Sequence, residues 1–481
     1  MSLSAALNLS LSGLTASARA AATTSENIAN AATPGYGRRS IDQVSGAENG
    51  VSLGVQVREI TRAEAPVLTQ LRRDADADAA ASDLRQQGLI NVERAIGKPG
   101  DVTAFPAQIA ALESAFAALA ATPESASLQT AVANQLSLLV QRFHAAEEQL
   151  GTVRESADRQ IATAVATLGD SLQRISDLNI QITAFQSSGR DVGTLLDQRD
   201  GLIDTVNRIV PVQVVPREGE QVSLYSTGGV VLLDTRPATL SFTPTPTIPS
   251  EARGDGGIPA SLLVNGREID MTRGTLGGGT LGAAFALRDE DAVVALAGID
   301  ALAADIATRL EAADTTRAAT APGLLADRNS AINLNAVAGL AGRLTLNPLV
   351  DVSEGGALWR LRDGLGTAAP QPSATARLPN ALLQSLREAA TAPDGLPDAA
   401  KDSAGHAAQL ANMITGKRLA SEDASTAASA GLATLSAEER DAVGVNTDTE
   451  LQTLLSIEAA YEANARVLSV LRTLYDTLLE I

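Results

Sequence analysis

The chain has 481 residues, no cysteine, two histidines and a formal net charge of -19. A chain of this length is expected to hold more than one domain. The absence of cysteine excludes disulfides and thiolate chemistry, and His144 and His406 lie too far apart in sequence to favour a zinc site or a Ser-His-Asp triad. We therefore expect no enzymatic activity, no cofactor and no metal.

Charge and hydropathy also limit the partners. A strongly acidic chain is repelled by DNA and by anionic lipid, so we expect no nucleic acid partner. No apolar run approaches the roughly 18 residues that span a bilayer, so we expect no membrane insertion. The N-terminal residues lack a positively charged segment ahead of an apolar one, and we expect no cleavable secretory signal. The chain is then either cytoplasmic or exported by another route.

Both ends of the chain are predicted to be helical, because apolar residues recur there at steps of three and four. The N-terminal stripe consists of Leu3, Leu7, Leu11, Leu14, Ala18, Ala21, Ser25 and Ile28. The C-terminal stripe consists of Leu454, Ile457, Tyr461, Asn464, Leu468, Leu471, Tyr475 and Leu478. Such helices are marginal alone and need a packing partner. Assembly with neighbouring subunits and closure of an intramolecular bundle both remain open. Asn464 is either a register-setting polar residue in a seam or an exposed polar residue beside one.

The interior opens with helix and then changes to strand. An apolar stripe of three- and four-residue steps from Val132 to Phe185 predicts one long helix within 124–187, and a shorter helix is expected over 194–209. Period-two patterns over 212–242 predict short strands, and Asn265-Gly266 predicts a hairpin between 262–264 and 267–271.

Further along the chain, the pattern returns to helix. Helix is expected over 293–313 and again, with breaks, from about 379 to 436, whereas 320–372 has no clear pattern. The fold class predicted from these patterns is mainly α: an elongated long-helix bundle or coiled coil formed by both ends of the chain, with a small inserted β domain. The expected domains are 1–36 plus 444–481 as a terminal coiled coil, 37–210 plus 280–443 as an elongated helical body, and 211–279 as the β insertion.

Three short motifs have a functional interpretation and a plainer one. Gly277, Gly279 and Gly282 spell G-x-G-x-x-G with Asp300 further on, but no return strand is expected, so we interpret this stretch as a β-to-α junction. The alternating aspartates at 74, 76 and 78 lack the glycine and the glutamate of a calcium loop and are interpreted as a solvated helix start. The tripeptide at 253–255, Arg-Gly-Asp, is interpreted as an exposed loop turn.

Two segments at the ends of the chain resemble the bacterial flagellar axial proteins. Residues 25–41 read SENIANAATPGYGRRSI, in which Asn27, Asn30, Thr33, Pro34, Gly35 and Tyr36 match the N-terminal signature. Residues 444–481 match the C-terminal signature at Glu450-Leu451, Leu454-Leu455, Ala460-Tyr461, Ala463 to Arg466 and Leu478. Within the family, LLDQRD at 195–200 and GGTLGAAFALRDE at 278–290 resemble the hook-associated protein 1 branch.

The resemblance implies a structural component of the flagellum, an adaptor ring at the hook–filament junction. It further implies self-association into a ring, contact with hook protein and with the next, filament-side hook-associated protein, and export to the extracellular flagellum without a cleaved signal. An export chaperone is expected to hold Leu454, Tyr461, Leu468, Leu471 and Leu478. The expected assembly interface consists of the apolar residues of both stripes, Asn464, and residues 27, 30 and 34–36. A hook or rod type of axial protein, and a monomeric surface adhesin with 253–255 at its tip, are the alternatives.

Overall fold

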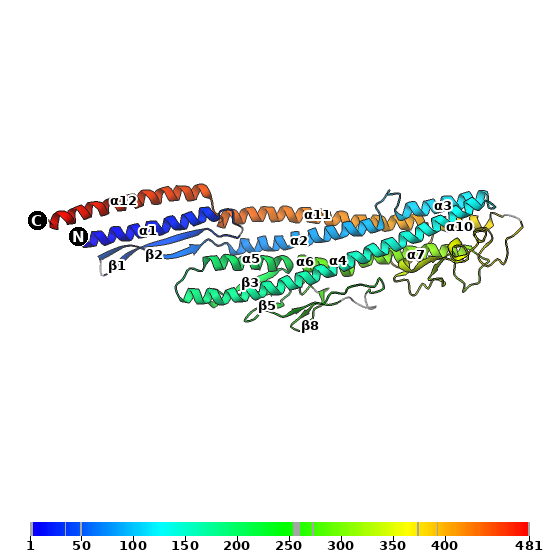
Figure 1. Ribbon diagram of the computed structural model, residues 1–481, viewed down its shortest axis with the longest axis horizontal. Coiled ribbons are helices and arrows are strands. Elements are labelled where there is room, and N and C mark those ends of the chain that lie inside the picture. Colours follow the sequence, from blue (N-terminus) through cyan, green and yellow to red (C-terminus); the bar gives the residue numbers. More distant parts are fainter. Residues whose placement is uncertain are drawn as a thin grey trace. The chain divides into compact units, whose positions relative to one another are not determined.

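The computed structural model describes residues 3–33, 35–48, 51–253, 260–271, 274–372, 375–391 and 393–479 (Figure 1). The chain is 63% helix and 10% strand, with long helices at both ends and a small strand-containing insertion. The predicted mainly α class is therefore confirmed.

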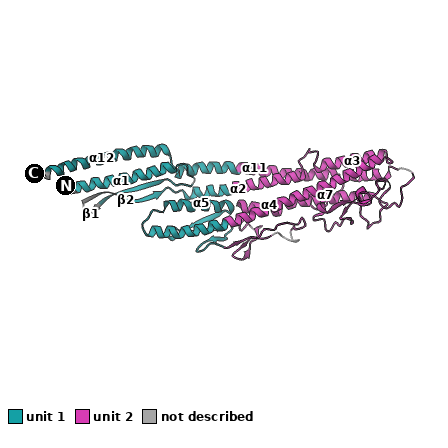
Figure 2. Cartoon of the chain, in the orientation of Figure 1, with its two compact units in different colours: residues 1–78, 168–238, 428–481 teal, residues 79–167, 239–427 magenta. Residues whose placement is uncertain are grey.

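The chain divides into two compact units (Figure 2). Unit 1 contains residues 1–78, 168–238 and 428–481, and unit 2 contains residues 79–167 and 239–427. Three of the four divisions fall inside the helices α2 (Pro66–Ile96), α4 (Ala126–Ser187) and α11 (Ser403–Val443), and the fourth lies between residues 238 and 239. The three-part domain scheme expected from the sequence stays a prediction.

Unit 1 combines the two ends of the chain with a hairpin, a helix and a small sheet. Its complete elements are α1 (Leu3–Asn30), β1 (Arg39–Glu48), β2 (Val51–Arg62), α5 (Gly193–Ile209), β3 (Val212–Pro216), a 3-10 turn (Glu218–Glu220), β4 (Val222–Ser226), β5 (Val231–Leu233) and α12 (Thr447–Leu479). Strands β1 and β2 pair in antiparallel fashion, with Arg39 opposite Arg62. This hairpin corrects the expectation of a helical body directly after residue 36, because β-branched residues such as Val55 and Val57 alternate with polar ones and suit a strand.

Unit 2 is built around helix packing. Its complete elements are α3 (Phe105–Ala121), β6 (Leu240–Ser241), β7 (Leu263–Val264), β8 (Arg267–Glu268), α6 (Gly279–Ala286), a π-helical turn (Leu287–Asp291), α7 (Ala292–Ala313), β9 (Leu325–Asp327), α8 (Leu340–Arg343), β10 (Leu344–Leu346), a 3-10 turn (Val352–Glu354), α9 (Arg360–Asp363) and α10 (Arg377–Arg387). Its hydrophobic core joins α3, α7, α10 and the parts of α4 and α11 that belong to the unit.

The long helix predicted within 124–187 is confirmed as α4. Every residue of its predicted apolar stripe is buried except Ala164 and Phe185, which are half-buried. A stripe this continuous arises because three- and four-residue steps keep one face of a helix turned toward its neighbours. The helix predicted over 194–209 is confirmed as α5, and the one over 293–313 as α7.

The strand-rich insertion contains two separate three-stranded sheets, ordered β3-β4-β5 and β6-β7-β8. The predicted hairpin at Asn265-Gly266 is confirmed, with both residues at positive φ, 52° and 76°. Asparagine followed by glycine tolerates this mirror-image turn, which matches the twist of paired strands. Strands β7 and β8 are shorter than the sequence suggested.

The short motifs have structural explanations where they are described. Gly279 begins α6, and the carboxylate of Asp300 accepts hydrogen bonds from the backbone nitrogens of Gly339 (2.8 Å) and Ala341 (2.7 Å), so it holds a loop. The alternating aspartates at 74, 76 and 78 lie inside α2, whose start is at Pro66, so the predicted helix start is corrected. Gly254 and Asp255 lie outside the described residues.

Unit 2 also contains a buried cluster of charged side chains. The guanidinium of Arg288 meets the carboxylate of Asp158 at 2.5 Å, and both side chains are buried. Arg154 donates to the backbone oxygens of Arg288 (3.1 Å), Pro249 (3.2 Å) and Ala252 (2.8 Å), and burial lowers the pKa of Arg154 to about 10. These contacts link α4 to the segment before β7. The buried charges of the cluster therefore have a structural role that needs no ligand. Among the described residues, no group of histidine and acidic side chains could hold a metal ion, and no helix is long and apolar enough to cross a membrane.

Candidate functional site

The two ends of the chain form one helical pair within unit 1. Helices α1 and α12 pack along each other, and strands β1 and β2 pack on α1 as well (Figure 1). Gly13 lies against Asn464, and Asn27 bonds to Glu450, so the two helices run in opposite directions. We call this arrangement, with its hairpin, the terminal module: α1, β1, β2 and α12.

The C-terminal stripe predicted from the sequence is the face of α12 turned toward α1. Leu454, Ile457, Asn464, Leu468 and Leu471 are half-buried, whereas the neighbouring positions along the helix are exposed. Tyr461 and Tyr475 are exposed, and the side chain of Leu478 lies outside the described residues. Of the two interpretations of Asn464, the structure agrees with the seam position, because the side chain packs on Gly13.

The N-terminal stripe is arranged differently. Leu7, Leu11 and Ala18 are exposed, Leu14, Ala21 and Ile28 are half-buried, and the side chain of Leu3 lies outside the described residues. The buried face of α1 is instead made of small and polar residues: Ser10, Ala16, Ala20, Thr23, Thr24 and Asn27. Small residues allow a close approach of helix and hairpin on both sides of α1. The role of either stripe in assembly stays a prediction.

Asn27 is the polar centre of the terminal module. It is 1% exposed, and both atoms of its amide are fully used. Its Nδ2 donates to the Arg39 backbone oxygen (2.8 Å) and to Oε2 of Glu450 (3.1 Å). Its Oδ1 accepts from the Arg39 backbone nitrogen (2.9 Å) and from the Tyr36 hydroxyl (2.9 Å). One asparagine therefore joins α1, the following turn, β1 and α12.

The turn after α1 carries the rest of the N-terminal signature. Gly35 has a φ of 80°, a conformation that favours glycine. Asn30 bonds to Thr33 (3.3 Å, Oδ1 accepting from Oγ1), and Pro34 lies outside the described residues. Burial raises the pKa of Tyr36 to about 12, an effect that the nearby Arg39 guanidinium opposes and that Glu26 adds to. The hydroxyl therefore stays a donor to Asn27 at neutral pH.

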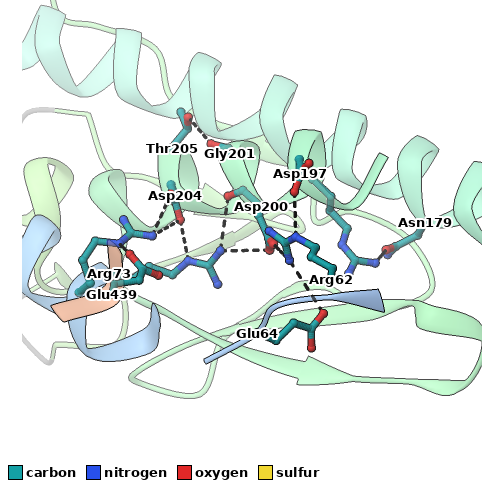
Figure 3. A network of polar contacts seen from close by, with 12 residues as sticks. Arg62, Glu64, Arg73, Asn179, Asp197, Asp200, Gly201, Asp204, Thr205 and Glu439 are labelled. Atoms are coloured by element: carbon teal, nitrogen blue, oxygen red, sulfur yellow. Dashed lines mark hydrogen bonds and ion pairs between the residues drawn. The ribbon is translucent and has the colours of Figure 1, made fainter. Parts of the chain in front are cut away.

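A second polar network fixes the hairpin and α2 to α5 (Figure 3). Asp197, Asp200 and Asp204 lie three and four residues apart, so they share one face of α5. Their partners are Arg39, Arg62, Arg72 and Arg73. We call this network the arginine–aspartate ladder.

The closest contacts of the ladder are charge-assisted. Nε of Arg62 donates to Asp197 (2.8 Å), and Nε of Arg73 donates to Asp204 (2.6 Å). Arg72 donates twice to Asp204 at 2.9 Å and once to Glu439 of α11 at 2.8 Å. Burial lowers the pKa of Arg72, but the carboxylates of Asp204 and Glu439 raise it more, so the net shift is upward. The ladder thus holds four segments of unit 1 together.

Sequence reasoning named Asn27, Asn30, Gly35 and Tyr36, and the structure brings Asn27 and Tyr36 together. The sequence reasoning did not single out Arg39, the ladder arginines or the partnership of Glu450 with Asn27. The spacing of the aspartates in α5 was the one available signal for the ladder, because acidic residues at positions i, i+3 and i+7 share a helix face. The arginine partners come from segments more than a hundred residues away, and no local pattern identifies them.

Comparisons with known proteins address the same segments. Residues 89–318 match the model of the flagellar hook-associated protein FlgK helical domain. Residues 7–36 match the flagella basal body rod protein model, and residues 442–481 match the flagellar basal body rod FlgEFG protein C-terminal model. The chain is therefore similar to flagellar hook-associated protein 1 in its helical domain and to flagellar rod proteins at its two ends.

Individual relatives of the hook-associated protein 1 family are distant. Flagellar hook-associated protein 1 of Salmonella typhimurium is 25% identical over 57% of this chain and 54% of its own length. The Escherichia coli protein of the same name is 24% identical over 57% of this chain and 55% of its own, and the Bacillus subtilis one is 23% identical over 46% of each. The chain thus spans about half the length of the curated relatives it matches. The solved flagellar hook junction protein FlgK from Burkholderia pseudomallei aligns with a TM-score of 0.46 and 20% identity over 54% of this chain and 46% of that one.

The two rod-protein models coincide with the ends that form the terminal module. The N-terminal match ends at Tyr36, and the C-terminal match contains Glu450. The matches at the two ends thus include Asn27, Tyr36 and Glu450, whereas Arg39 lies just beyond the N-terminal match.

Proposed function

We propose that this chain is a structural, non-enzymatic component of the bacterial flagellum that joins hook and filament as an adaptor ring. The observation that carries the proposal is the terminal module. Its two helices pair with each other, yet both leave large apolar side chains in water, among them Leu11, Leu455 and Val470. Exposed apolar rows on a paired helix are typical of a surface that packs against another subunit. The similarity to flagellar hook-associated protein 1 supports the hook–filament junction as the place of that assembly.

The partners follow from this role. We propose self-association into a ring, contact with hook protein on one side, and contact with the next, filament-side hook-associated protein on the other. The location is the extracellular flagellum, reached by export without a cleaved signal. Leu454, Tyr461, Leu468, Leu471 and Leu478 form the expected binding site of an export chaperone, since an unpaired apolar helix in the cytoplasm favours aggregation.

Two alternatives are weaker. A hook or rod type of axial protein accounts for the matches at the two ends but not for the match to the helical domain over residues 89–318. A monomeric surface adhesin has no support, because the matching families are flagellar and two residues of its proposed tip lie outside the described residues.

The test is complementation of a strain of the source bacterium that lacks its own copy of the gene. The unaltered chain should restore filament attachment, whereas Leu468→Asp and Ala21→Asp should not, because each places a carboxylate at a half-buried position of the terminal module. Leu419→Asp, which changes an exposed leucine of α11, is the matched control and should behave as the unaltered chain. Normal attachment in the Leu468→Asp strain would refute assembly through the terminal helices.

A further inference from the structure

A groove lies on the terminal module between α1 and β2. Its volume is about 460 Å³, and its lining includes Leu11 and Thr15 of α1 and Val55 and Val57 of β2. Leu11 and Val55 are exposed in this chain, at 55% and 37%. The groove therefore has accessible apolar side chains, interspersed with the polar side chains of Asn8, Ser12 and Gln56.

One end of the groove carries a single positive charge. Arg19 lines it and is the only basic residue of α1. Among the residues that the structure describes, no carboxylate lies within ion-pairing distance of Arg19. An unpaired guanidinium beside the exposed side chains of Leu11 and Val55 favours a helical occupant with an apolar face and an acidic residue at the edge of that face.

The face of α12 turned away from α1 has this character. Its exposed apolar residues follow one another at steps of three and four: Leu455, Ala459, Ala463, Val467, Val470 and Leu474. We call this row the outer stripe. Glu458 and Glu462 lie along one edge of the outer stripe, and Glu458 has no ion-pair partner within the described part of the chain.

We propose that the groove receives the outer stripe of α12 from a second copy of this chain, with Arg19 of one copy facing Glu458 of the other. The inference rests on the proposed assembly role and adds which surface meets which. The contact is head-to-tail, because a groove on one copy meets a different surface on the next. Contacts of this type generate rings or helical polymers, depending on whether the rotation closes.

The arrangement of α1, the hairpin and α12 within one chain explains why the groove must receive α12 from a different copy. The C-terminal stripe of α12 already packs on α1, and the outer stripe points away from it. Hairpin and α12 lie on different sides of α1 in the view of Figure 1. The outer stripe of a chain cannot reach the groove of the same chain without separation of α1 from α12.

A charge exchange tests the pairing between copies. Arg19→Glu and Glu458→Lys should each lower filament attachment about tenfold or more, since each sets like charges against each other at the contact. The double variant should restore attachment. Co-expression of the two single variants should also restore it. When the two variants alternate, the new glutamate of one copy faces the new lysine of its neighbour, and the next contact keeps the original arginine and glutamate. A contact within one chain would stay mismatched in both single variants, so rescue by mixing identifies a contact between copies.

Cysteine cross-linking gives an independent measurement in a chain that has no cysteine of its own. Thr15→Cys and Ala459→Cys, carried on separate copies, should give a mixed dimer on isolated hook–filament structures after mild oxidation. Asp423→Cys, at an exposed position of α11, replaces Ala459→Cys in the control and should give none. Circular dichroism of each purified variant confirms that it folds.

Each outcome decides a separate question. Normal attachment in both single variants, rescue by the double variant but not by mixing, or a cross-link from Thr15→Cys to hook protein or a chaperone would overturn the proposed occupant. Failure of the unaltered chain to restore attachment would instead overturn the proposed function.

Discussion

Asn27 and Glu450 lie 423 positions apart in sequence and meet in a hydrogen bond of 3.1 Å between Nδ2 and Oε2. Both side chains are buried, at 1% and 6% exposure. The contact joins the last turns of α1 to the first turn of α12, where Asn446 caps the helix through the backbone nitrogens of Asp448 (3.1 Å) and Thr449 (3.2 Å). The start of the C-terminal helix is therefore positioned by a residue near the end of the N-terminal one.

Asn27→Asp should loosen this junction. The new carboxylate cannot donate to the Arg39 backbone oxygen and faces the carboxylate of Glu450 at a buried site. The expected cost is about 2–4 kcal/mol, since a buried acceptor loses its donor and a like charge is placed beside it. Hydrogen exchange should show faster exchange in α1 and α12.

The control for this prediction lies in the same signature. Among the described residues, the side chain of Asn30 bonds only to the Glu26 backbone oxygen (3.0 Å) and to Thr33 (3.3 Å), so Asn30→Asp should change exchange in α12 very little. Adding Glu450→Gln to Asn27→Asp should recover part of the loss, because the glutamine amide can donate to the new carboxylate. Equal exchange in both aspartate variants would contradict the special position of Asn27.

Tyr36 should give a pH dependence to the same junction. Burial raises its pKa from 10.0 to about 12, which means that the folded chain favours the neutral phenol. The stabilisation is complete below pH 10 and is lost as the pH rises from about 10 toward 12, because the unfolded chain then ionises first. Tyr36→Phe removes the hydrogen bond to Asn27 at every pH, at a cost of about 1 kcal/mol, and removes this alkaline loss.

A spectrophotometric titration of the tyrosines checks the shift. The chain has four tyrosines, so the difference between the unaltered protein and Tyr36→Phe isolates one phenol. That difference should titrate near pH 12. A midpoint near the ordinary tyrosine value of about 10 would show that the hydroxyl is not buried against Asn27.

Local periodicity predicted the helices well, and α4 is the clearest case. Its stripe from Val132 to Ile182 needs no knowledge of the partners, because a three- and four-residue repeat specifies which face is buried whatever covers it. The C-terminal stripe of α12 was predicted in the same way. For α1 the same reasoning chose the leucine row, whereas the chain buries a different face, made of small and polar residues such as Ser10, Ala16 and Ala20.

The contacts that organise the site are not periodic, and the sequence alone could not assign them. The hairpin was missed because Gly46 and Gly54 interrupt its strands, and both lie next to register irregularities or at positive φ. The partners of Asp197 and Asp204 lie more than a hundred residues away, as does that of Asn27 on α12. Signature residues can be recognised from a resemblance, but their bonding partners become visible only in the folded chain.

Asp204→Asn should weaken the arginine–aspartate ladder. It removes the charge that Arg72 and Arg73 share, and Arg73 is almost fully buried. The expected loss is about 1–3 kcal/mol, below that of a fully buried pair because Asp204 is partly exposed. Exchange in α5 and at the start of α2 should quicken. Asp170→Asn, at an exposed position of α4, is the control, and an equal effect from it would remove the ladder as the cause.

Gly13 and Asn464 give the last prediction, a coupling between the two terminal helices. A Cβ on residue 13 would lie 2.8 Å from Nδ2 of Asn464 and 3.0 Å from its Cγ, so the asparagine must move to admit even alanine. Alanine is otherwise better than glycine inside a helix by about 1 kcal/mol. Gly13→Ala alone should therefore fail to stabilise α1, whereas the same change in an Asn464→Ala background should stabilise it by about 1 kcal/mol. Exchange protection of α1 in the four variants of this cycle measures the coupling. Equal gains in both backgrounds would mean that Asn464 does not pack against Gly13, and the seam assignment of that asparagine would then be wrong.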